Sequence, residues 1–445
     1  MITKNSIFTL SDSVKISFNL MLVIYVLSIP FQSLEFDFMG FDIGPSEIVF
    51  IILAPLAIIQ IMISGQKLWI DKLDLFVFGW LASNILAGWH AGFDSIVVTQ
   101  IIKTAYLVVL YMIFKWTISP KMITRIVKVI ILSSLMAALT GITGFGLRYL
   151  GIDTNLSITR PFPYSVENVI QAKGFTPTPN MLASIIMIGI LFQIQKLSVN
   201  RSSSKGIDYV ILFMLLLGFF LTFSKTVVCL LIGIIFVLYF RYKSVLSYTS
   251  QLTTRIAVAS LFIVSILGTY FIIVEKDQVS ELLKGDYIAG PALTETVNYS
   301  IYPSQYWSLE EISFKAISQS FPWGLGPGKF NDYAHELKNN DAYPTHVPYP
   351  DPHSTYLGTL AENGLLGLIS LFGIIYFVIK YSRKILSNHT ADQNMFASLP
   401  TVFIVIGIEA LSTDVMNFRH YWILLILLVS TFQNVKSTSS KSLNL

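Results

Sequence analysis

The sequence predicts an all-α polytopic membrane protein with about twelve transmembrane helices and one large loop on the non-cytoplasmic side. Hydrophobic residues make up 53% of the 445 residues and charged residues only 13%, whereas soluble domains carry about 25% charged residues. Apolar runs of membrane-spanning length recur along the whole chain. Basic residues gather in alternate short connections between these runs, as the positive-inside rule requires.

Twelve apolar runs are long enough to cross a hydrocarbon core of about 30 Å. They lie near residues 16–34, 44–64, 73–89, 95–115, 124–146, 180–197, 208–223, 226–241, 256–274, 354–379, 396–413 and 419–434. Because they lack strict alternation and are too long for barrel strands, we expect helices. Only Ser224-Lys225 separates the seventh run from the eighth, which predicts a tight hairpin.

The basic residues predict the topology. They gather around Lys67, Lys121, Arg201, Lys243 and Arg383, and in both tails. This distribution places both termini in the cytoplasm. The formal net charge of +4 is modest and lies in short clusters, which indicates membrane topology and no nucleic-acid binding. No small-residue cleavage site follows the first run, so we expect an uncleaved first span.

Three regions follow. Residues 1–274 hold the first nine spans, with an outward loop near 147–179. Residues 275–353 form the largest polar segment, and residues 354–445 hold the last three spans and a tail. The large loop is rich in Tyr, Trp, Pro and Gly without low complexity, so we expect it to fold. Its Ser308-Leu-Glu-Glu311 has capping-box form and predicts a helix over 309–320.

Metal and cofactor sites have little support in the sequence. Cys229 is the only cysteine, which excludes an internal disulfide and a Cys-based zinc site. The Gly-rich run at 324–328 departs from the spacing of a phosphate-binding loop. A metal site made of His335, His346 and His353 has no supporting spacing. We therefore expect no metal and no cofactor.

His353 is the strongest candidate for chemistry. It lies where the large loop enters the tenth apolar run, directly after Asp351 and Pro352. A histidine at a wet helix start titrates near neutral pH and exchanges protons. Glu362 follows nine residues later, inside the span, and an ionisable residue there is a functional candidate by default.

Five motifs carry a resemblance. They are His353 followed by Glu362-Asn-Gly-Leu-Leu-Gly367-Leu, Gly174-Phe-Thr-Pro-Thr-Pro-Asn180, Thr222-Phe-Ser-Lys225, Trp323-Gly-Leu-Gly-Pro-Gly-Lys-Phe330, and Arg419-His-Tyr-Trp422. Together they resemble the O-antigen ligase and O-antigen polymerase superfamily of bacterial inner-membrane proteins, over roughly residues 170–435. Lys225 stands where that family usually has Arg.

The resemblance implies a metal-independent, membrane-embedded C-type glycosyltransferase with a large periplasmic loop. Its donor would be a glycan on undecaprenyl pyrophosphate, and its acceptor another lipid-linked glycan or lipid A–core. His353 would act as general base. Pyrophosphate gathers negative charge as it leaves, so fixed cations would stabilise it. The candidates for binding pyrophosphate or glycan are Lys225, Arg160, Lys173, Arg419, Glu362 and His420.

Several functions stay open at this stage. A polymerase of surface polysaccharide repeat units is favoured, followed closely by a ligase, because the acceptor site has no recognisable motif. A twelve-span transporter or flippase is the rival from another class. Transporters usually show related halves and interrupted mid-span helices, and neither is evident in the sequence. A structural partner of a glycan-assembly complex is the third alternative.

Overall fold

The computed structural model describes residues 4–38, 41–65, 68–161, 168–199, 205–242, 248–275, 292–339, 351–387 and 398–442. Helices dominate these ranges, as the sequence predicts. The strands within them form three small antiparallel sheets, two of which are two-stranded hairpins. The architecture is therefore all-α, with β-structure confined to connections.

The helices and strands follow in chain order. The N-terminal part contains α1 (Lys4–Ser28), the 3-10 turn η1 (Ile29–Phe31), β1 (Phe36–Phe38), β2 (Phe41–Ile43), α2 (Pro45–Ser64), α3 (Lys72–Ala91), α4 (Ser95–Thr117), α5 (Pro120–Tyr149), β3 (Ser157–Pro161) and β4 (Asn168–Ala172). The middle part contains α6 (Pro179–Val199), α7 (Lys205–Phe220), α8 (Val227–Tyr242), α9 (Tyr248–Tyr270) and β5 (Phe271–Glu275). The remainder contains β6 (Thr294–Glu295), β7 (Tyr299–Pro303), α11 (Gln305–Ser320), α12 (Phe330–Asn339), α13 (Thr355–Ser387), α14 (Ser398–Glu409) and α15 (Arg419–Ser442).

Each predicted apolar run overlaps one of these helices. Among the described residues, six helices are long and apolar enough to cross a membrane, namely α1, α2, α4, α5, α6 and α13. Shorter apolar segments lie in α7, α8, α9 and α14. The chain is thus a multi-pass helical membrane protein, and the crossing of all twelve runs stays a prediction.

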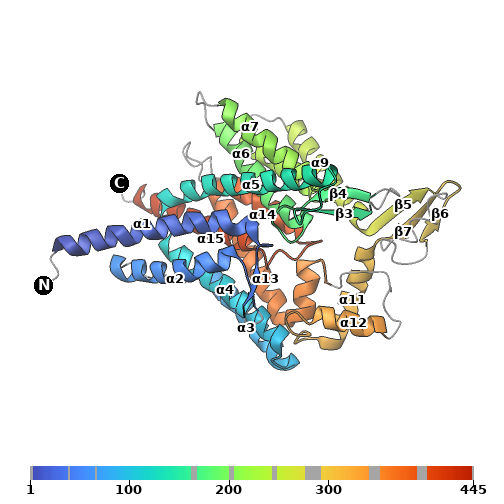
Figure 1. Cartoon of the computed structure of the whole chain (residues 1–445), viewed down its shortest axis with the longest axis horizontal. Coiled ribbons are helices and arrows are strands. Elements are labelled where there is room, and N and C mark those ends of the chain that lie inside the picture. The colour runs from blue at the N-terminus through green and yellow to red at the C-terminus, as the bar shows by residue number, and fades with distance from the viewer. Residues whose placement is uncertain are drawn as a thin grey trace.

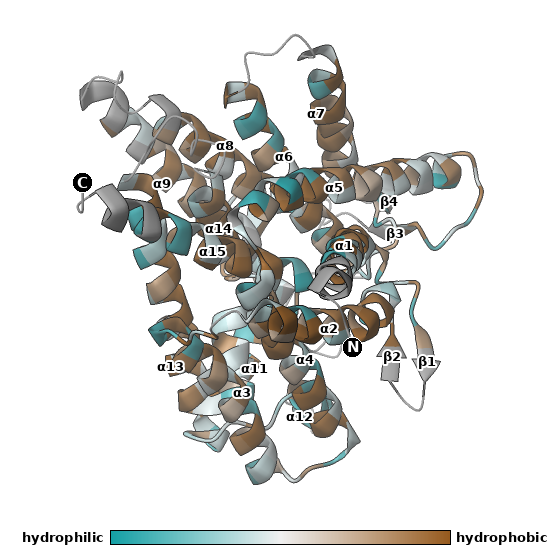
Figure 2. Ribbon diagram, turned by 90° about the vertical axis from the view of Figure 1, so that its left-hand side faces the viewer, coloured by the Kyte–Doolittle hydropathy of each residue, from teal (hydrophilic) through white to brown (hydrophobic). Residues whose placement is uncertain are grey.

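The core of the bundle lies around α6 and α15. Most of α6 from Met181 to Phe192 is buried, as is the stretch of α15 from Tyr421 to Val429. The outer helices instead leave large apolar side chains exposed, such as Ile51 on α2 and Phe213 on α7. Figure 2 shows hydrophobic residues along much of both outer helices. Exposed apolar surface of this kind suits contact with lipid.

The two ends of the bundle differ. Figure 1 shows the start of α1 and the end of α15 at one end, and α11, α12 and the strands β3 to β7 at the other. The sequence predicts the same arrangement, with both tails on one side and the polar loops opposite.

Three boundaries differ from the prediction. The ninth helix ends at Tyr270, because residues 271–275 pair with β7 as a strand. The connection between α7 and α8 spans residues 221–226 and is longer than the predicted two-residue hairpin. The predicted helix at 309–320 begins one turn earlier, at Gln305, so Ser308 lies inside it. Neither α12 nor the β-hairpins were predicted, because each element is shorter than the window over which periodicity is informative.

Candidate active site

His353 is held in a turn immediately before α13. The Asp351 carboxylate accepts a hydrogen bond from the backbone N–H of His353 at 2.8 Å and also pairs with its Nδ1. This is an Asx-type turn, and it helps His353 to adopt a left-handed backbone with φ of 42°. Because Asp351 engages Nδ1, the imidazole presents Nε2 as its free nitrogen.

Tyr306 joins His353 to Lys225. The rings of Tyr306, near the start of α11, and His353 have centroids 5.5 Å apart. The Lys225 Nζ lies 3.5 Å from the centroid of the Tyr306 ring. The three side chains come from three separate parts of the chain. The structure therefore brings together the predicted base and the predicted principal cation.

The Lys225 ammonium has no acceptor among the described residues. Its Nζ is shielded from solvent and has no hydrogen-bond partner. Glu409 on α14 is close enough to interact with it electrostatically. One Glu409 oxygen accepts from Ser184 at 2.9 Å, and the other has no hydrogen-bond partner among the described residues. Shielding an ammonium without a hydrogen-bonding partner is costly. An anionic group bound beside Lys225 would offset this cost.

The turn that carries Lys225 is tied to the segment before α6. Ser224 Oγ donates to Asn180 Oδ1 at 2.8 Å and lies 2.8 Å from the Thr226 hydroxyl. The backbone N–H of Ala172 donates to the Leu221 carbonyl at 2.9 Å. Two of the sequence motifs, 174–180 and 222–225, are thus neighbours in space, and these hydrogen bonds hold the Lys225 turn in position.

A second pair of motifs also meets. The backbone N–H groups of Leu325 and Gly326 donate to the carbonyls of Ala361 and Glu362 at 2.8 and 3.0 Å. Helix α13 is interrupted at Gly364, whose φ is 65° and ψ −163°. A Cβ there would lie 2.2 Å from the Pro322 carbonyl oxygen, and one at Gly324 would lie 2.4 Å from the Glu362 carbonyl oxygen. Glycine is therefore required on both sides of this contact.

Glu362 lies beside a cavity of about 470 Å³, which the kinked start of α13 borders. Its Oε1 accepts a hydrogen bond from the Phe330 N–H at 3.3 Å. Asp351 and Asp414 line the same cavity. Burial, together with the nearby charge of Asp351, raises the pKa of Asp414 to about 6. The predicted pair His353 and Glu362 thus belongs to one region, although no direct contact joins the two side chains.

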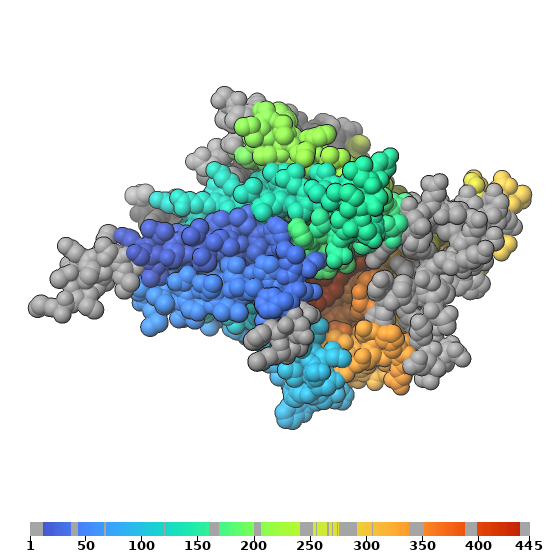
Figure 3. Space-filling view, viewed as in Figure 1, coloured from blue at the N-terminus to red at the C-terminus, as the bar shows by residue number. Residues whose placement is uncertain are grey.

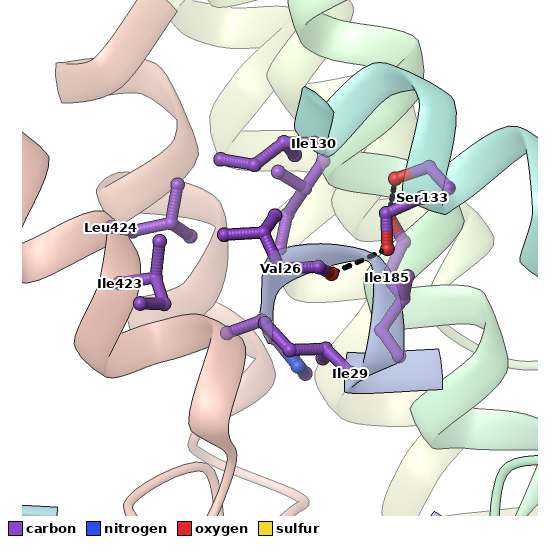
Figure 4. A pocket seen from close by; sticks show the side chains of 10 residues that line it. Val26, Ile29, Ile130, Ser133, Ile185, Ile423 and Leu424 are labelled. Carbon is purple, nitrogen blue, oxygen red and sulfur yellow. Dashed lines mark hydrogen bonds between the residues drawn. The ribbon is translucent and has the colours of Figure 1, made fainter. Parts of the chain in front are cut away.

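Arg419 and His420 lie in other networks. Arg419 Nε is paired with Glu47 Oε1 at 2.5 Å, next to the hydrogen-bonded hydroxyls of Tyr25 and Tyr106. The ring of His420 is buried, and its Nε2 lies 3.3 Å from the Ser184 hydroxyl. His420 also lines a small cavity of about 20 Å³, whose walls Figure 4 shows to be mostly aliphatic. A role for either residue in substrate binding stays a prediction.

Arg160 lies in strand β3 of the β3–β4 hairpin, and Lys173 directly follows strand β4. Lys173 is half-buried and follows Ala172, the residue that bonds to the Lys225 turn. Arg160 pairs with Val169 in the hairpin, and its side chain lies outside the described part of the structure. His346, considered above for a metal site, also lies outside the described residues.

Sequence reasoning missed three parts of this site. The sequence shows Asp351 only as an acid near His353. Nothing in the Asp351-Pro352-His353 segment predicts that the carboxylate pairs with the imidazole. Tyr306 was one of many loop aromatics. Asp414 carried the clearest available signal, because it is a lone acid in the short connection between the last two apolar runs. Within the described residues, no group of three or more His, Cys, Asp or Glu is arranged to hold a metal ion.

The fold and the site together define a multi-pass membrane protein with a cluster of polar and charged side chains at one end of the bundle. Residues 210–372 match the family model described as O-Antigen ligase. This match confirms the resemblance to the O-antigen ligase and polymerase superfamily. It includes Lys225, Tyr306, the Gly-rich run, His353 and Glu362, and it excludes Arg160, Lys173, Arg419 and His420. No curated protein matches the chain.

Proposed function

We propose that this protein is a membrane glycosyltransferase that polymerises the repeat units of a bacterial surface polysaccharide. It would use glycans linked to undecaprenyl pyrophosphate, at the periplasmic face of the inner membrane. The observation that carries the proposal is the convergence of His353 and Lys225 on Tyr306 within the region that matches the family. A base beside a shielded cation is what glycosyl transfer from a pyrophosphate requires.

In the proposed mechanism, His353 activates the acceptor hydroxyl. The hydroxyl oxygen attacks the anomeric carbon while its proton passes to Nε2 of His353. The bond between that carbon and the pyrophosphate oxygen breaks, with inversion at the sugar. Asp351 holds Nδ1 and stabilises the imidazolium that forms.

Lys225 is the proposed partner of the leaving pyrophosphate. As the glycosidic bond breaks, negative charge grows on the phosphate oxygens, and a fixed cation in a partly dry site stabilises it. Because lysine is a point charge without the bidentate fork of arginine, further donors are needed for orientation. Lys173 and Arg160 are candidates, since their hairpin adjoins the Lys225 turn. The reaction as proposed involves no metal.

Ligation is the second candidate function, and the description of the matching family favours it. The donor and the chemistry would be the same, with lipid A–core as acceptor. Deleting the gene and examining the surface glycan on a gel separates the two. A single repeat on the core indicates a lost polymerase, and free lipid-linked polymer with bare core indicates a lost ligase. An unchanged glycan together with a defect in solute uptake would support the transporter instead.

Substitution of His353 tests the mechanism. We expect His353→Ala to give the same glycan defect as the deletion while the protein inserts into the membrane in normal amount. His335→Ala is the matched control, because His335 lies in the same loop on α12 and outside the site. Normal glycan from the His353→Ala strain would remove this residue from the reaction.

A further inference from the structure

The cavity beside Glu362 has a chemistry opposite to that of the Lys225 site. It is bordered by α3, α4 and the start of α13, and by the segments 327–331 and 414–417. In Figure 3 a recess opens on this face, between the N-terminal helices and the segment that carries α11 and α12. Its volume of about 470 Å³ lies within the range of about 300–1,000 Å³ typical of ligand pockets.

Acids and amides dominate the polar part of the lining. Three carboxylates contribute, from Asp351, Glu362 and Asp414, and no Lys or Arg belongs to the described residues that line the cavity. Amide side chains from α3, α4, α12 and α13 supply further acceptors and donors. Such a lining attracts groups that donate hydrogen bonds and repels anions.

One buried amide in the lining lacks a partner. Asn363 is 7% exposed, and its Oδ1 has no hydrogen-bond partner among the described residues. Leaving a buried carbonyl oxygen unpaired is unfavourable. Its position in the cavity wall makes it an acceptor available to a ligand hydroxyl.

His353 lies at the boundary between the two environments. Its chain neighbours Pro352 and Ser354 both line the cavity, while its ring packs against Tyr306 on the Lys225 side. A pyrophosphate is therefore expected on the cationic side, and an uncharged sugar bearing the attacking hydroxyl on the acidic side. On this arrangement the base lies between donor and acceptor.

We propose that this cavity binds the terminal sugar of the acceptor glycan and selects neutral or amino-bearing sugars over anionic ones. The inference rests on the proposed glycosyltransferase function and adds to it the acceptor class. It also predicts the chemistry of the polysaccharide, because in a polymerase the acceptor is a lipid-linked glycan built from the same repeat unit. The sugar that accepts each new repeat would carry no carboxylate or phosphate.

The test uses the purified full-length protein in lipid nanodiscs. The donor is the lipid-linked repeat unit extracted from the deletion strain. Two soluble acceptor probes are compared: the repeat glycan released from the lipid by mild acid, and the same glycan after oxidation of its terminal primary alcohol to a carboxylate. We expect the wild type to use the neutral probe at least tenfold better in kcat/KM.

Lysine substitutions on the cavity wall should reverse this preference. Asn331→Lys places a cation at the exposed rim, and Gln100→Lys places one deeper in the wall. Each should shift the kcat/KM ratio toward the anionic probe by more than the wild-type preference, so that the anionic probe becomes the better acceptor, without changing the KM for the donor. Thr99→Lys is the matched control, because it adds the same charge one residue away and outside the cavity lining.

The outcomes separate the two proposals. Transfer by the wild type with no discrimination between the probes, or an equal effect of Thr99→Lys, would overturn the acceptor assignment and leave the transferase intact. Absence of transfer to both probes, together with a normal surface glycan in the deletion strain, would overturn the proposed function and the inference with it. A reversed preference in the Asn331→Lys and Gln100→Lys variants alone would support both.

Discussion

Replacing Lys225 with methionine should affect activity and stability in opposite directions. The Lys225 Nζ is shielded, lacks a hydrogen-bond acceptor among the described residues, and lies 3.5 Å from the centroid of the Tyr306 ring. The cation–π contact contributes about 0.5–2 kcal/mol, and shielding the ammonium costs a similar amount or more. Methionine keeps the apolar stem and removes the charge. The folded protein should therefore be as stable as the wild type or more stable.

The same change should nearly abolish transfer. A preorganised group that stabilises developing charge is typically worth about 10²–10³ in kcat, or about 3–4 kcal/mol. We expect a loss of this size for Lys225→Met and a smaller loss for Lys225→Arg, which keeps the charge. Lys315→Met is the matched control, since Lys315 lies on α11 and pairs only with Glu311 among the contacts described.

The assay is the formation of glycan polymer in nanodiscs from the lipid-linked repeat unit, with thermal unfolding measured on the same preparations. Activity of Lys225→Met within threefold of the wild type would refute the assignment of Lys225 to the leaving group. A large fall in its unfolding temperature would indicate that the lysine is structural, and the argument from an uncompensated charge would fail.

Three further predictions concern the surroundings of the site. Gly364→Ala should destabilise the protein by about 3 kcal/mol or more, because its Cβ would lie 2.2 Å from the Pro322 carbonyl oxygen at a φ of 65°; Gly146→Ala, where a Cβ meets nothing within 4 Å, should be neutral or stabilising in thermal unfolding. The pKa of Asp414 is raised to about 6 from an ordinary 3.8, so the folded state binds the Asp414 proton more tightly than the unfolded state does. The stability that this proton contributes is full below about pH 4 and is lost as the pH rises to about 6. The unfolding free energies of Asp414→Asn and wild type should therefore converge at low pH and diverge above it, and parallel curves would contradict the assignment. Arg419→Met and Glu47→Leu should each lower the free energy of unfolding by about 3–5 kcal/mol, because each single change leaves a partly buried charge unpaired. The double variant should lose much less than the sum of the two. Additive effects in the double-mutant cycle would show that the pair is not coupled.

Periodicity and composition were sufficient to predict the helices that overlap the long apolar runs, because membrane spans are long and nearly uniformly apolar. The same information could not fix the ends of elements decided by pairing. Residues 271–275 are as apolar as a helix end, yet they pair with β7 across a connection that no local pattern predicts. Helix α12, only ten residues long, lies below the length at which periodicity is informative.

Within the candidate site, residue type and position relative to the apolar runs were the basis for proposing His353, Lys225 and Glu362. Their geometric relations depend on side-chain contacts between distant segments, such as Ser224 with Asn180 and Tyr306 with His353. Arg419 illustrates the limit of the reasoning. Its position predicts an outward-facing cation, whereas its pairing with Glu47 on α2 has no signal in the local sequence.

The side of the membrane on which the site lies is the central claim, because lipid-linked donors are proposed to be used in the periplasm. The direct test is labelling with a membrane-impermeant maleimide in a Cys229→Ser background. Single cysteines are placed at Val297, which is 90% exposed before β7, and at the exposed Lys436 near the end of α15.

We expect a cysteine at position 297 to react when only the outer membrane is permeabilised, and one at position 436 to react only after lysis of the inner membrane. The reverse pattern would place Lys225 and His353 in the cytoplasm and contradict the account.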